Sequence, residues 1–182
     1  MCLIALSIKK ETDWSGKESY FFNLAANRDE YHDRPTSQLG WWEDKEILAG
    51  KDELAGGTWL GFSKSGRFAA LTNYKENTSK EFKLSRGFLV IDFLDSNQSA
   101  KSYLESLNGK DYAGFNLIVG DRNGLFYFCN RSDGIYLLPE GVHALGNLSL
   151  NNNTDKIKSV KMDFGKLFLS EFKTQSALDM MK

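Results

Sequence analysis

The chain has 182 residues, of which 41% are hydrophobic and 26% are charged, and its formal net charge is −1. This length and composition suit a single globular domain over residues 1–182 with a substantial core. The near-zero charge indicates neither nucleic-acid binding nor attraction to an anionic membrane. No apolar run reaches the roughly 20 residues that a membrane-spanning helix needs, and the first residues do not resemble a signal peptide, so we expect a cytoplasmic protein without a membrane span.

The first predicted element is a strand over residues 1–9, and its second residue is a cysteine. If Met1 is removed, as the small side chain of cysteine permits, Cys2 carries a free α-amine beside its thiol. An α-amine titrates near ~7.7–8.0 and a thiol near ~8.5, so the amine can accept the thiol's proton near neutral pH. The alternative interpretation is more common: a cysteine in an apolar strand is usually a small, inert hydrophobic residue.

A second strand is predicted over residues 20–26, and it leads into the polar tetrapeptide Asn27-Arg28-Asp29-Glu30. If the two strands pair as a hairpin, the end of the second strand lies beside the start of the first. Arg28 would then favour the thiolate of Cys2, and Asp29 would orient the α-amine. The alternative is a solvated turn that carries surface ion pairs.

Residues 39–61 are rich in glycine and tryptophan and contain a short predicted strand at 47–50. The glycines permit tight turns and the close approach of another surface. The next strand, 67–74, ends in polar side chains, so the amide of Asn73 is a candidate donor to a developing oxyanion. Asn73 could equally form a turn or cap the strand.

Two helices are predicted next, one over residues 86–95 with Ser85 as its N-cap and one over residues 100–107 with Gly109 as its stop. Strands at 115–119, 125–129 and 135–138 follow, with hairpin turns at Asn123-Gly124 and Asp133-Gly134, which predicts an antiparallel meander containing a buried Cys129. The last elements are a short strand or turn at 142–148 and a helix from Asp155, whose lysines are interpreted as a solvated face.

The two histidines, His32 and His143, have no metal-ligand spacing to each other or to the cysteines. We therefore expect no structural metal. A haem iron could use either histidine, although nothing in the sequence favours one of them. The two cysteines are too few for a disulfide scaffold, and reduced thiols are expected.

Six blocks in chain order resemble the Transport and Golgi Organisation 2 family, also called the NRDE family. The blocks are Met1-Cys2, Asn27-Arg28-Asp29-Glu30 with Arg34-Pro35, Gly56-Gly57-Thr58-Trp59-Leu60-Gly61, Leu71-Thr72-Asn73-Tyr74, Ser85-Arg86-Gly87 and Phe115-Asn116-Leu117. The resemblance implies an α+β fold of the N-terminal nucleophile hydrolase type, an αββα sandwich in which helices flank two antiparallel sheets.

The sequence departs from the family pattern in its second half. It has Gly146-Asn147 where the family usually has Ser-Asn, and Asn153-Thr154-Asp155-Lys156 where the family has a proline- and tryptophan-containing stretch before a lysine. No block resembles the family's later Tyr-Gly-Thr-Arg strand region. We therefore expect the C-terminal strands of the sandwich to be missing.

The resemblance implies a cysteine hydrolase or acyltransferase that acts on a non-peptide amide or a thioester and requires no cofactor. By position, Cys2 would be the nucleophile, Arg28 would stabilise its thiolate and Asp29 would hold the α-amine. Asn73 and Asn147 would serve the oxyanion.

Family members have also been linked to haem mobilisation and to lipid or acyl-coenzyme A metabolism. This supports an alternative, a carrier for haem or a lipid-like ligand in which Trp41, Trp42 and Trp59 line an apolar groove. Ligand binding would then survive Cys2→Ala. A third hypothesis is a structural remnant of the family that has neither activity.

Overall fold

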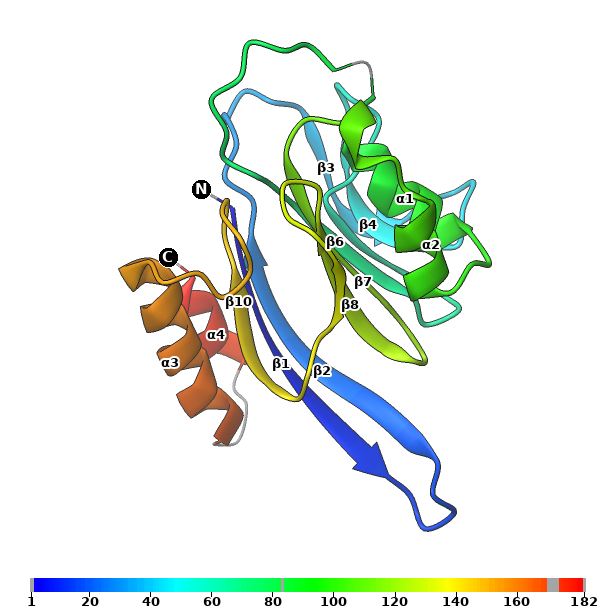
Figure 1. The fold of residues 1–182 in the computed structure, drawn as a ribbon, viewed down its shortest axis with the longest axis vertical. Coiled ribbons are helices and arrows are strands. Elements are labelled where there is room, and N and C mark those ends of the chain that lie inside the picture. Colours follow the sequence, from blue (N-terminus) through cyan, green and yellow to red (C-terminus); the bar gives the residue numbers. More distant parts are fainter. Residues whose placement is uncertain (1, 83, 170–173, 182) are drawn as a thin grey trace. The chain divides into compact units, whose positions relative to one another are not determined.

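The computed structural model describes residues 2–82, 84–169 and 174–181. These residues form an α+β structure with two antiparallel sheets and several helices. The chain divides into two compact units (Figure 1). Unit 1 combines Met1–Asp29 with Leu138–Lys182, and unit 2 is the intervening segment Glu30–Leu137. The organisation as one domain over residues 1–182 stays a prediction.

Unit 1 contains a three-stranded sheet with the N-terminal strand at its centre. The strand order is β10 (Gly141–Leu145), β1 (Leu3–Thr12) and β2 (Glu18–Asn27). The predicted hairpin of the first two strands is confirmed, and Leu3 lies opposite Asn27 in its register. On the other side of β1, Ile4 lies opposite Leu145. The register therefore aligns the start of β1 with the end of both of its neighbours.

Helices cover one face of this sheet. The predicted last helix is α3 (Asp155–Leu169), and α4 (Thr174–Met180), which the sequence pattern did not predict, follows it. One hydrophobic cluster joins β1, β2, β10 and the two helices, and it includes Leu3, Ala5, Ala25, Ala144, Ile157, Val160, Phe164 and Ala177. The sequence predicts helical spacing for Ile157, Val160, Phe164, Leu167 and Phe168. The first three are buried as this spacing requires, and the side chain of Phe168 lies outside the described residues.

Unit 2 contains a seven-stranded sheet. Its order is β3 (Thr36–Trp41), β4 (Ile47–Asp52), β5 (Leu60–Ser63), β6 (Phe68–Asn73), β7 (Phe115–Asp121), β8 (Gly124–Cys129) and β9 (Ile135–Leu137). The predicted meander of β7, β8 and β9 is confirmed, and Cys129 is buried in it. The strands β3 and β5 were not predicted, because β3 is almost wholly exposed and β5 has only 4 residues.

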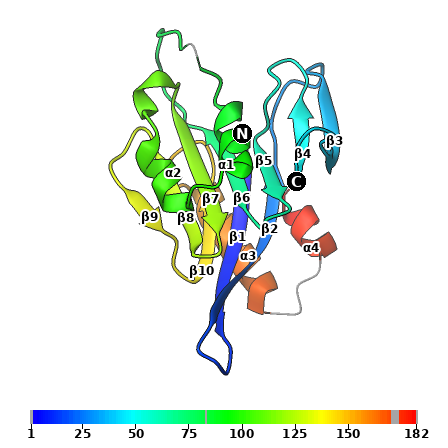
Figure 2. The same ribbon diagram turned by 90° about the vertical axis from the view of Figure 1, so that its right-hand side faces the viewer.

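Two helices cover one face of the larger sheet (Figure 2). The predicted helices are α1 (Gly87–Asp95), which packs on β4, β5 and β6, and α2 (Ala100–Ser106), which packs on β7, β8 and β9. Two predicted boundaries are wrong. The N-cap of α1 is Arg86, which makes no side-chain cap, because Ser85 contributes its backbone carbonyl to the first turn instead. The helix α2 ends at Ser106, before Gly109, because the backbone at Leu107 is already extended. Gly109 is instead the first residue of the short 3-10 helix η1 (Gly109–Asp111).

The glycine-rich blocks allow the predicted close approach of two backbones. A Cβ atom at Gly57 would lie 2.9 Å from Cα of Gly87, and Gly56 adopts a φ of 69°. Only glycine fits such a contact without moving either segment. Arg86 fixes the same region, since its guanidinium donates to the carbonyl of Gly114 at 2.8 Å. Two of the six motif blocks therefore build the scaffold of unit 2.

Candidate functional site

The predicted nucleophile lies at the start of the central strand of unit 1. Cys2 is half-buried, and its Sγ lies 3.9 Å from the backbone oxygen of Asp29. When the register of β1 with β2 continues by one residue, Cys2 falls opposite Arg28. On the other side of β1, the last paired residues are Ile4 and Leu145, and Asn147 lies two residues beyond the end of β10, in a bend. Arg28 and Asn147 thus come from the segments that follow the two strands paired with β1.

These positions share one face of the sheet. Neighbouring residues of a strand point to opposite faces, and residues directly opposite each other point to the same face. Leu3 belongs to the cluster under α3 and α4, so Cys2 lies on the other face together with Arg28. Asn27 lies on the helix-covered face, where its Nδ2 donates to the oxygen of Met181 at 3.5 Å.

The structure distributes the predicted site residues over both units. Arg28 and Asn147 are half-buried in unit 1, and Asp29 is exposed there. Asn73 is exposed in unit 2, at the end of β6 and opposite Phe115. The hairpin that carries Arg28 and Asn27 to the start of β1 is confirmed, whereas the catalytic roles of the five residues stay predictions.

The remainder of the family motif has a structural role in unit 2. Nε of Arg34 lies 2.7 Å from Oδ2 of Asp52 and 3.9 Å from Oε2 of Glu30. The carboxylate of Asp52 also accepts the backbone amides of Leu54 and Ala55. This ion pair therefore ties the segment before β3 to the turn after β4.

A polar clasp closes the loop that carries Asn147, and the sequence analysis did not identify it. Asn151 has a positive φ of 54°; its backbone amide donates to the oxygen of Ala144 at 2.9 Å, and its Oδ1 accepts the amide of Ala144 at 3.0 Å. Its Nδ2 lies 3.0 Å from Nδ1 of His143, whose Nε2 lies 2.9 Å from the oxygen of Pro139. Asparagine tolerates the left-handed region, so the run Asn151-Asn152-Asn153 was the available signal.

The clasp predicts a pH dependence of stability. Burial lowers the pKa of His143, and the ring accepts from Asn151 in its neutral form. At pH values between the folded and unfolded pKa of this histidine, the folded protein therefore binds fewer protons than the unfolded chain. The neutral ring contributes stability above the unfolded histidine pKa of about 6.5, and this stability is lost as the pH falls through the folded pKa. Denaturant unfolding of the wild type and of His143→Gln from pH ~7.5 to pH ~5, about one unit above that value to about 1.5 units below it, tests this.

We expect the difference in the free energy of unfolding between the two proteins to shrink as the pH falls. His32→Gln is the matched control, because His32 is the other histidine of the chain and lies exposed in unit 2. A difference that does not change with pH for His143→Gln would show that the neutral clasp is not the cause.

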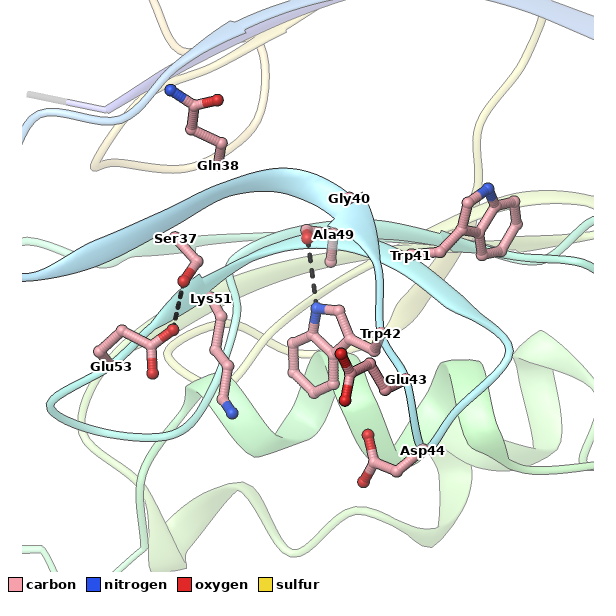
Figure 3. A pocket seen from close by; sticks show the side chains of 10 residues that line it. All are labelled: Ser37, Gln38, Gly40, Trp41, Trp42, Glu43, Asp44, Ala49, Lys51 and Glu53. Atoms are coloured by element: carbon pink, nitrogen blue, oxygen red, sulfur yellow. Dashed lines mark hydrogen bonds between the residues drawn. The ribbon is translucent and has the colours of Figure 1, made fainter.

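Unit 2 contains a separate hollow of about 430 Å³ beside the edge strand β3 (Figure 3). Its lining residues are Ser37, Gln38, Gly40, Trp41, Trp42, Glu43, Asp44, Ala49, Lys51 and Glu53. This differs from the predicted apolar groove, because Trp59 does not line the hollow and four of the lining residues are charged. Residues of β3, the following turn and β4 form it, and Trp41 and Trp42 are its tryptophans.

Among residues 2–82, 84–169 and 174–181, no group of three or more histidine, cysteine, aspartate or glutamate side chains could hold a metal ion. Within the same ranges, no helix is both long and apolar enough to cross a bilayer.

The fold places the chain in a class of proteins. It is similar to the solved structure of the Caenorhabditis elegans ortholog of N-acylethanolamine-hydrolyzing acid amidase, with a TM-score of 0.65 and 12% sequence identity. The similarity covers 100% of this chain and 86% of that chain. The predicted fold class is therefore confirmed: the chain has an N-terminal nucleophile hydrolase-like fold built on two antiparallel sheets.

The family follows from the sequence. The model of the family described as Transport and Golgi organisation 2 matches residues 1–181, and the chain belongs to this family. The human Transport and Golgi organization protein 2 homolog is 39% identical over 176 residues, which are 89% of this chain and 62% of that protein. The mouse homolog is 38% identical over 173 residues, which are 88% of this chain and 60% of that protein. The chain thus spans about 60% of the length of these relatives.

Proposed function

We propose that the protein is a cysteine hydrolase or acyltransferase that acts on a non-peptide amide or a thioester through an N-terminal Cys2. One observation carries the proposal: Cys2 directly precedes the central strand, its Sγ lies 3.9 Å from the backbone oxygen of Asp29, and Arg28 directly follows the residue paired with Leu3. The fold supports it, because the similar nematode protein is named as an amidase that hydrolyses N-acylethanolamines, which contain an amide bond.

The proposed reaction has two acyl-transfer steps. The α-amine of Cys2 accepts the thiol proton, and Sγ attacks the acyl carbonyl carbon to form a C–S bond. A donor such as the side-chain amide of Asn147 stabilises the resulting oxyanion. When the oxyanion collapses, the C–N or C–S bond to the leaving group breaks, and the leaving group takes the proton from the α-ammonium. Water or another acceptor then attacks the thioester and regenerates the thiol.

Arg28 and Asp29 act on the nucleophile in this proposal. A guanidinium on the same face as the thiol lowers the free energy of the thiolate, and a carboxylate near the α-amine holds it in the required orientation. The nucleophile should therefore react faster than an ordinary cysteine near neutral pH.

The first test measures the intact mass of the purified protein before and after brief treatment with a limiting amount of a thiol-alkylating reagent at neutral pH. We expect a mass without Met1 and a single adduct, which peptide mapping places on Cys2. Arg28→Met should slow this labelling by about 10-fold, which corresponds to a rise of about one unit in the thiol pKa.

Cys129 is the internal control, because it is fully buried in β8. Equal labelling of the two cysteines, or a mass that includes Met1, would contradict the proposal in this form. Labelling of Cys2 at the same rate in Arg28→Met would remove Arg28 from the proposed machinery and leave the nucleophile in place.

The alternative is a non-catalytic carrier for haem or a lipid-like ligand. It predicts that ligand binding survives Cys2→Ala. The hollow beside Trp42 does not favour this alternative, because haem propionates and coenzyme A phosphates are anionic, whereas Glu43, Asp44 and Glu53 line the hollow. A haem or acyl-coenzyme A titration of the wild type and of Cys2→Ala distinguishes the two functions.

A further inference from the structure

The hollow of unit 2 has features that the proposed acyl transfer does not use. Its volume of about 430 Å³ lies within the range of small-molecule sites. It lies entirely within unit 2, between the edge strand β3, the following turn and β4. All of its lining residues are described, and none of them belongs to the predicted catalytic set.

Of the two tryptophans that line the hollow, Trp42 presents its ring face to it. Trp42 is partly buried against the core under α1, and its Nε1 donates to the oxygen of Ala49 at 3.2 Å. This bond and the packing fix the orientation of the ring. The face of a fixed indole carries negative electrostatic potential, so it attracts a cation placed over it. Figure 3 shows the Trp42 ring within the hollow and the Trp41 ring pointing away from it.

The ammonium of a lysine of this chain lies over the face of the Trp42 ring. Nζ of Lys51 lies 5.5 Å from the centroid of the Trp42 ring. In the described part of the chain, Lys51 forms no ion pair, although three carboxylates line the same hollow. The side chain of Lys51 is long and flexible, so a competing ammonium can displace it at small cost.

The charge of the lining favours a cationic ligand. The carboxylates of Glu43, Asp44 and Glu53 outnumber the single ammonium of Lys51. Glu43 follows Trp42 directly and forms no ion pair or hydrogen bond with the described residues. Figure 3 shows its carboxylate beside the indole. An ammonium over the ring would therefore contact both an aromatic face and an uncompensated carboxylate.

We propose that this hollow binds a small organic ammonium compound, which takes the place of the Lys51 ammonium on the face of Trp42. The ligand class follows from the ring, the excess of carboxylates and the resident lysine together, whereas an anion would be repelled and a neutral molecule would gain only contact area. The proposal does not depend on the proposed acyl transfer, because it involves no residue of that site.

The test compares choline with its neutral isostere 3,3-dimethylbutan-1-ol, which has the same shape without the charge. Isothermal titration and tryptophan fluorescence of the full chain measure both affinities. We expect saturable binding of choline that weakens with added salt, and weaker binding of the neutral isostere by about 10-fold, since desolvated cation–π and carboxylate contacts are lost together.

Substitutions of the charged lining residues should change the affinity for choline in opposite directions. Lys51→Gln should tighten choline binding by about 3-fold or more, because it removes the competing cation and one positive charge. Glu43→Gln should weaken it by a similar factor. Trp42→Leu should remove binding, and Trp14→Leu is the matched control because Trp14 is 99% exposed in the turn between β1 and β2.

Three outcomes would overturn the proposal: no saturable binding of choline, equal affinity for the neutral isostere, or weaker choline binding in Lys51→Gln. The last comparison does not depend on whether Trp42→Leu folds, because Lys51 lies at the surface end of β4 and its substitution leaves the indole in place. Cys2→Ala should bind choline as the wild type does.

Discussion

Phe164→Ala is expected to destabilise unit 1 by about 3–5 kcal/mol, the usual cost of removing a fully buried phenylalanine. Phe164 is fully buried where α3 packs against β1 and β10, in one cluster with Leu3 and Ala144. The truncation would leave a cavity under the strands that carry the candidate site. Amide hydrogen exchange in β1 and β10 measures the loss, because it reports on unit 1 itself.

Met162→Ala provides the control on the same helix. Met162 is 59% exposed, so its truncation should change the free energy of opening by less than about 0.5 kcal/mol. If the amides of β1 and β10 exchanged as slowly in Phe164→Ala as in Met162→Ala, the packing of Phe164 would not stabilise the sheet. Slower alkylation of Cys2 in Phe164→Ala than in the control would further indicate that the packing of α3 supports the site.

The parts of the fold with strong sequence periodicity were predictable. The apolar run of the first strand, the solvated lysine face of the last helix and the turns at Asn123-Gly124 and Asp133-Gly134 each predicted one local structure, and these elements are confirmed. The exposed strand β3 carries no such pattern, since an edge strand with solvent on both sides has no reason to alternate. Its pairing with β4 depends on tertiary contacts that a local pattern does not record.

The candidate site was partly predictable for a similar reason. A hairpin brings the end of one strand beside the start of the other, so the approach of Arg28 to Cys2 followed from the pairing alone. Asn147 follows the end of β10, which pairs with β1 across more than a hundred residues of sequence. Only the family resemblance indicated this residue, because no local signal links positions so far apart.

The hollow beside β3 differs from the apolar groove that the tryptophans predicted. Three tryptophans within one glycine-rich segment favoured an apolar groove, but neighbouring residues on a strand point to opposite sides. Trp41 and Trp42 therefore separate, and the turn residues Glu43 and Asp44 lie beside the second indole (Figure 3). Because the two rings point in different directions at the end of β3, the ring of Trp42 lies among carboxylates and not in an aromatic cluster.

Insertion of an arginine between Met1 and Cys2 is expected to lower acyl transfer by about 10²–10⁴-fold, the usual contribution of a positioned general base. A large residue after Met1 prevents its removal, so the thiol remains but its α-amine becomes part of a peptide bond. The assay follows thiol release from an aryl thioester of a short fatty acid, and mass spectrometry follows the acyl adduct on Cys2.

Two substitutions are the controls for the insertion variant. Cys2→Ala should abolish both the adduct and turnover, because no nucleophile remains, whereas Cys129→Ala should retain both, because that thiol is buried in β8. Full activity of the insertion variant would contradict the role of the α-amine, since the thiolate alone would then suffice. Loss of activity with the thiol still present would instead support the free amine of Cys2 as the proton acceptor, because the insertion keeps the nucleophile and removes only the amine beside it.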